Sequence, residues 1–108
     1  MTPAARAEAA ITILDRILAG DPAEPALLRW SRASRYAGSG DRAAVRDLVF
    51  DALRRKRSRA ALGGAMTGRG LILGMCRDQG LDPAALFTGE GHAPVSYTHL
   101  TLPTILRV

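Results

Sequence analysis

The residues best suited to chemistry are basic side chains that gather in the middle of the chain. Residues 29–59 carry ten of the fifteen basic side chains and only three acidic ones, a local net charge of +7. Guanidinium groups bind phosphate through paired hydrogen bonds and also stack on bases. The segment therefore predicts contact with RNA or another polyanion, through Arg29, Arg32, Arg35, Arg42, Arg46, Arg54, Arg55, Lys56, Arg57 and Arg59.

Two simpler explanations compete with RNA contact. Arginine is encoded by GC-rich codons, so part of the net charge of +5 over the whole chain reflects base composition. Cations near the end of a helix also interact favourably with its macrodipole, and a charged helix face is usually just solvated. One or two cations suffice for that purpose, whereas five basic residues fall within positions 54–59. We therefore favour RNA contact over a merely solvated face.

Two aromatic residues, Trp30 and Tyr36, lie in the same segment. Aromatic rings stack on unpaired bases in RNA complexes, and they also anchor hydrophobic cores. We expect Trp30 to belong mainly to the core, while for Tyr36 the two roles are equally open.

The sequence offers no combination of residues that would make an active site. Cys76 lies among Leu and Met residues of an expected helix, which favours a buried, inert thiol over a nucleophile. With one cysteine in the chain, neither an internal disulfide nor a Cys-rich zinc site can form. His92 has no second plausible metal ligand near it, so we expect no metal and no cofactor in this chain.

Helical spacing of apolar residues runs through most of the chain before residue 95. Thr2 followed by Pro3 is typical of a helix start, and we expect Asp41 and Thr67 to cap two further helices. Three glycines should weaken the helix that follows Thr67. The expected helices cover residues 3–19, 25–37, 41–57, 58–65 and 68–79, with a short turn over 82–87.

These elements predict an all-α fold, a bundle of about five helices in a single domain. The chain of 108 residues has only five aromatic residues, and no strand-like alternation occurs before residue 95. No apolar run approaches the roughly 20 residues of a membrane span, and the N-terminus lacks the zones of a signal peptide. We therefore expect a cytoplasmic protein without a membrane partner.

The stretch SRYAGSGDRAAVRDLVFDALRRKRS resembles the N-terminal helical domain of bacterial 16S rRNA (cytosine-C5) methyltransferases of the RsmB/Fmu type. That family has a loop ending in a D-R motif, here Asp41-Arg42, followed by a helix of defined pattern. The stretches TPAARAEAAITILDRILAG and ALFTGEGHAP also resemble the family, so the similarity covers residues 2–94. The helix pattern is occupied here by Val45, Leu48, Val49, Phe50, Leu53 and Arg54.

The resemblance implies that residues 1–89 form an RNA-binding domain with the fold of the transcription antitermination protein NusB. Residues 90–94 would begin an interdomain linker, and 16S rRNA would be the partner. A methyltransferase domain outside this chain would bind S-adenosylmethionine and use two cysteines to methylate a cytosine. This chain has one cysteine and no strand followed by a glycine-rich loop, so those catalytic residues cannot be transferred to it. An RNA-binding fragment of an enzyme is the expectation.

The C-terminal residues 95–108 differ in character from the rest of the chain. VSYTHLTLPT resembles the conceptual translation of the mosaic-end adapter used in transposase-based sequencing libraries. The codons GTC-TCT-TAT-ACA-CAT-CTG-ACG-CTG-CCG-ACG encode those ten residues in order. We expect adapter read-through that is extended or disordered and has no function; a divergent natural linker is the alternative.

Two other functions compatible with the residues remain open. One is a stand-alone NusB-like factor that acts in transcription through RNA and protein contacts. The other is a small helical protein-interaction domain without a nucleic-acid role. Salt-dependent binding to 16S rRNA fragments separates the second from both RNA-binding hypotheses.

Overall fold

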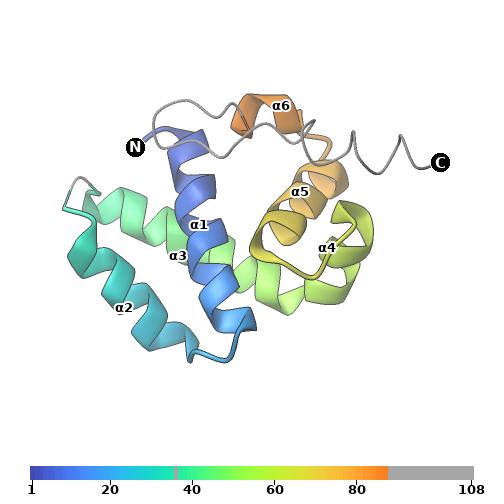
Figure 1. The fold of residues 1–108 in the computed structure, drawn as a ribbon. Helices are drawn as coiled ribbons and strands as arrows, with labels where there is room; N and C mark the ends of the chain where they lie inside the picture. The colour runs from blue at the N-terminus through green and yellow to red at the C-terminus, as the bar shows by residue number, and fades with distance from the viewer. Residues whose placement is uncertain (36, 88–108) are drawn as a thin grey trace.

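The computed structural model describes residues 1–35 and 37–87, and every regular element in those ranges is a helix (Figure 1). The all-α prediction is confirmed for that part of the chain. A short sixth helix occupies the segment expected to be a terminal turn, while residues 90–94 and 95–108 lie outside the described residues. The helices are α1 (Pro3–Leu18), α2 (Ala23–Ala33), α3 (Ser39–Arg54), α4 (Lys56–Gly63), α5 (Gly68–Gln79) and α6 (Pro83–Leu86).

Helix α1 is the element around which the others pack. Its start is as predicted, because Thr2 Oγ1 accepts a hydrogen bond of 3.1 Å from the Ala5 amide and Pro3 takes the first helical position. The helix crosses α3 and also contacts α2, α5 and α6 (Figure 1). One core results, and its fully buried members include Ala10, Ile13, Leu14, Val45, Val49, Leu71, Ile72 and Cys76.

Helix α5 is fixed to α1 at its N-terminus. Thr67 caps it as predicted, and the Gly68 amide donates a 2.7 Å hydrogen bond to Asp15 Oδ1 of α1. A carboxylate at this position also interacts favourably with the positive end of the helix dipole. Gly80 ends the helix in the left-handed conformation, with φ of 70°.

Helices α4 and α5 approach each other at backbone distance. A Cβ added at Gly74 would collide with the carbonyl oxygen of Arg59, and one added at Gly63 would collide with that of Gly70. The glycines of α5 were expected to weaken the helix. Although glycine has a low helix propensity, the glycine at position 74 allows the backbone of α4 to pack directly against α5. A larger residue there would prevent this close packing.

Three predicted helix boundaries are wrong in ways that affect the basic segment. Helix α2 leaves helical geometry at Ser34, where ψ is 74°, rather than continuing to residue 37. Helix α3 begins at Ser39, so Asp41 lies in its first turn and is not the cap. The helix also stops before Arg55, whose φ and ψ of −117° and 25° separate α3 from α4. The four consecutive basic residues therefore span a corner between two helices.

Asp41 joins the start of α3 to the start of α1. Its carboxylate accepts hydrogen bonds from Arg6 Nη2 at 2.8 Å, from the Gly38 amide at 3.2 Å and from the Met1 amino group at 3.2 Å. The Arg6 hydrogen bond is the largest cause that lowers the pKa of Asp41, from 3.8 to about 2.

Acidification should therefore destabilise the fold through Asp41. Because the folded pKa lies below the ordinary value, the unfolded chain binds more protons between pH 3.8 and about 2. The stabilisation is present above this window and is lost as the pH falls through it. Urea unfolding at a series of pH values should show a steeper loss for the wild type than for Asp41→Asn. Asp47→Asn, at an exposed position of the same helix, should keep the wild-type slope; parallel curves for wild type and Asp41→Asn would contradict this role.

Candidate nucleic-acid interface

The structure divides the ten predicted RNA-binding residues into four locations. Nine of them are exposed and Arg59 is buried. Two line a groove between α2 and α3, four lie at the corner between α3 and α4, and three lie on α2 or directly after it. The predicted residues are thus divided among separate parts of the surface, and one of them is buried.

The four consecutive residues Arg54, Arg55, Lys56 and Arg57, which we call the basic corner, project from the junction of α3 and α4. All four are exposed, and the side chains of Arg54 and Arg55 retain 76% and 62% of their accessible area. Asp51 lies 3.6 Å and 3.9 Å from these two guanidinium groups, distances at which exposed pairs contribute little. The basic corner therefore carries an accessible positive charge that Asp51 offsets only in part.

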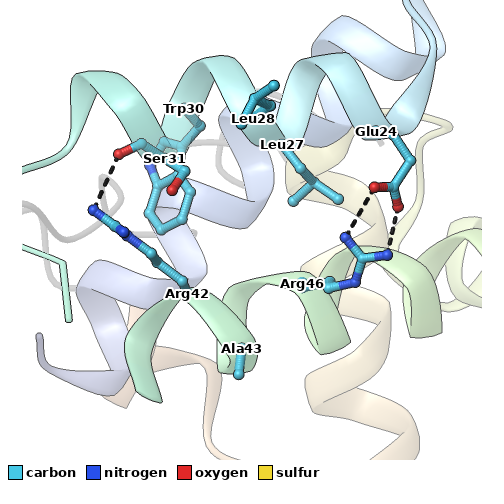
Figure 2. Close-up of a pocket in the computed structure, with 8 residues that line it drawn as sticks. All are labelled: Glu24, Leu27, Leu28, Trp30, Ser31, Arg42, Ala43 and Arg46. Carbon is cyan, nitrogen blue, oxygen red and sulfur yellow. Dashed lines mark hydrogen bonds and ion pairs between the residues drawn. The ribbon is translucent and has the colours of Figure 1, made fainter. Parts of the chain in front are cut away.

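Arg42 and Arg46 lie one turn apart on α3 and bridge to α2 across a groove of about 260 Å³ (Figure 2). Arg42 Nη2 donates a long hydrogen bond of 3.4 Å to the Ser31 carbonyl oxygen. Arg46 pairs with both carboxylate oxygens of Glu24, with one of the two distances at 3.2 Å. We call this the α2–α3 groove; its lining residues are Glu24, Leu27, Leu28, Trp30, Ser31, Arg42, Ala43 and Arg46.

Arg46 is held from two directions. Its guanidinium lies 4.9 Å from the centre of the Phe50 ring, one turn further along α3. The Arg46 hydrogen bond is also the largest cause that lowers the pKa of Glu24, and the same contact raises the pKa of Arg46. Glu24 therefore remains ionised and offsets part of the positive charge at this end of the groove.

Arg29, Arg32 and Arg35 do not line the α2–α3 groove. Arg29 instead lies 3.7 Å from Asp21, in the connection that precedes α2. Arg35 follows the end of α2, so only Arg29 and Arg32 lie on the helix that was expected to carry all three. These three residues remain exposed cations, but the groove is built without them.

Arg59 must be removed from the predicted surface. Its side chain is only 2% exposed, and Nη2 contacts Asp51 of α3 at 3.1 Å and Asp78 of α5 at 3.5 Å. The residue was grouped with 54–57 because it is close in sequence, yet it lies on the inner side of α4. It joins three helices and is not available to bind RNA.

Trp30 combines the two roles considered from the sequence. It is partly buried and packs against the core, and it also lines the α2–α3 groove. Figure 2 shows its ring between the two helices, beside Ser31 and Arg42. Tyr36 lies outside the described residues.

Sequence reasoning missed the acidic and apolar residues of the groove. Glu24, Leu27 and Leu28 precede the basic segment and have no unusual spacing. Leu28 does carry one structural signal, because its 52% exposure is high for a large apolar side chain. Its position on the rim becomes clear only when α2 and α3 are placed together.

The remaining chemical expectations concern Cys76, metals and membranes. Cys76 is fully buried, as predicted, and desolvation is the largest cause that raises the pKa of its thiol. This favours the unreactive protonated form. Within residues 1–35 and 37–87, no group of three potential metal ligands is found, and no helix there is long and apolar enough to cross a membrane.

Comparison of the chain with protein-family models, with curated proteins and with solved structures found no match.

Truncation of Arg59 tests whether this buried residue contributes more to stability than its exposed neighbours do. Arg59→Ala should destabilise the protein by about 3 kcal/mol, because it removes two charge-assisted contacts and leaves a cavity between helices. Arg57→Ala removes an equal charge from the basic corner and should change stability by less than about 0.5 kcal/mol. Urea unfolding followed by circular dichroism measures both effects. Equal midpoints for the two variants would show that Arg59 does not anchor α4.

Proposed function

We propose that this chain is an RNA-binding domain whose main contact surface is the basic corner. Four consecutive exposed cations at a helix junction suit the phosphate backbone, which dominates the affinity of proteins for nucleic acid. Arginine supplies three of the four and can pair with phosphate through two hydrogen bonds. The exposure of all four side chains is the observation that carries the proposal.

We further propose that the domain belongs to a 16S rRNA cytosine-C5 methyltransferase of the RsmB/Fmu type and works in the cytoplasm. The resemblance of residues 2–94 supports this assignment, with its D-R motif at Asp41-Arg42. Asp41 joins α3 to α1, and Arg42 faces the α2–α3 groove. In this proposal the domain positions rRNA, while S-adenosylmethionine and the methyl transfer belong to a separate catalytic domain.

Neutralising the basic corner should weaken RNA binding. The variant Arg54→Gln/Arg55→Gln/Arg57→Gln removes three phosphate contacts, so the slope of log affinity against log salt should fall by about 2 units for single-stranded RNA. Affinity at physiological salt should fall at least tenfold. Fluorescence anisotropy with labelled 16S rRNA fragments at several salt concentrations measures both quantities.

The matched control is Arg29→Gln/Arg32→Gln/Arg35→Gln. It lowers the net charge by the same three units, at exposed arginines that lie outside the basic corner. Its affinity should fall less, because only non-local electrostatics are lost. Equal losses in both variants would show that RNA is not bound preferentially at the basic corner. Absence of salt-dependent binding by the wild type would overturn the RNA-binding function itself and favour a protein-interaction domain.

A further inference from the structure

We infer that the α2–α3 groove receives one unpaired base of the bound RNA, an inference that rests on the proposed RNA-binding function. The groove combines an apolar interior with hydrogen-bonding groups on its rim. Leu27, Leu28 and Trp30 supply the apolar part, whereas Arg42 and Arg46 supply cations from α3 (Figure 2). A nucleobase has the matching chemistry, with apolar faces, polar edges and an attached phosphate.

The size of the groove favours a single ring system. Its volume of about 260 Å³ lies below the roughly 300–1,000 Å³ of sites that enclose drug-sized ligands. Arg42 and Arg46 bridge the helices at two places along the groove, and this also limits the length of an occupant. The small volume therefore favours a single planar group over an extended peptide or a duplex.

Trp30 gives the groove an aromatic surface. Base stacking on aromatic side chains is the usual means by which proteins hold unpaired bases of RNA. Because Trp30 also packs against the core, its position is fixed before a base arrives. Leu28, which is 52% exposed, also lines the groove.

Charge complementarity favours RNA over an apolar protein segment. Arg42 has only a 3.4 Å hydrogen bond to the Ser31 carbonyl oxygen, so a phosphate could take its place at small cost. Arg46 and Glu24 offer a donor and an acceptor to the base edge at the other bridge. A strand leaving the groove along α3 would reach the basic corner after about 12 Å, measured from Arg46 to Arg54 at the helical rise.

Trp30 is the only tryptophan of the chain, so its fluorescence reports on the groove directly. The test compares a single-stranded oligoribonucleotide of about ten nucleotides with an abasic oligomer of equal length and charge. The base-containing RNA should quench Trp30 and bind about tenfold more tightly, since stacking requires bases. Both should show the same salt slope, because their phosphate contacts are the same.

A blocking variant tests the location. Ala43 is exposed and lines the groove from α3, so Ala43→Leu should fill the space without disturbing the core. The variant should lose the quench and bind both oligomers with the affinity of the abasic one. Ala85→Leu, at an exposed position of α6 outside the groove lining, should behave as wild type. Circular dichroism confirms that both variants fold.

The outcomes separate this inference from the proposed function. Equal, salt-dependent binding of both oligomers without quenching overturns the base site and leaves RNA binding at the basic corner intact. Quenching that persists in Ala43→Leu also overturns it, because the base would then act on Trp30 from elsewhere. If neither oligomer binds in a salt-dependent manner, the RNA-binding function fails, and the groove inference fails with it.

Discussion

The buried guanidinium of Arg59 is the interaction on which the basic surface depends. It contacts Asp51 on α3 and Asp78 on α5 from a position on α4 that is 2% exposed. Hydrogen bonds and ion pairs of this kind fix geometry because the partners of a buried charge cannot be exchanged for water at low cost. Arg59 therefore holds α4 against its neighbours immediately after the change of direction at Arg55.

The close approach of α4 and α5 has the same consequence. Gly63 and Gly74 allow the two backbones to meet, so α4 lies flat against α5 and its remaining side faces solvent. The corner between α3 and α4 then presents Arg54, Arg55, Lys56 and Arg57 outward. One buried cation, Arg59, thus fixes the helix that follows the corner, while the four neighbouring cations remain exposed.

The α2–α3 groove has a different origin. Helix α2 is attached to the rest of the domain mainly through α1, and its contact with α3 is made by long side chains. The Arg46–Glu24 pair and the Arg42 hydrogen bond bridge the two helices and leave an accessible space beside Trp30. This arrangement suits a site that can admit a planar ligand without any change in the core.

Local signals in the sequence were sufficient to predict most of the helices. Thr2 and Thr67 act through hydrogen bonds within a few residues, and each performs its predicted role. The break between α3 and α4 was predicted after residue 57 rather than at Arg55, because the helical pattern continues through Arg55, so the corner formed by the basic residues was missed. The burial of Arg59 depends on Asp78, a partner on another helix, so sequence proximity to the basic corner gave the wrong environment.

The groove shows the same limit of sequence reasoning. Arg42 and Arg46 were identified by charge, but the early end of α2 at Ala33 and the reach of Glu24 across to α3 are tertiary properties. Arg29 looked equivalent to them by composition, yet it lies beside Asp21 and does not line the groove. Residue type thus identified the cationic side chains, while packing decided which of these arginines lie in one groove.

Chemical-shift mapping of the full chain by NMR tests the account most directly. On addition of a single-stranded 16S rRNA fragment, we expect changes in the amides and side-chain NH groups of Arg42, Arg46, Arg54, Arg55 and Arg57, and in the Trp30 indole. Arg59, enclosed between Asp51 and Asp78, should keep its shifts. Changes confined to α1, α5 or α6, or no changes at all, would contradict the assignment of the basic corner as the RNA-binding surface.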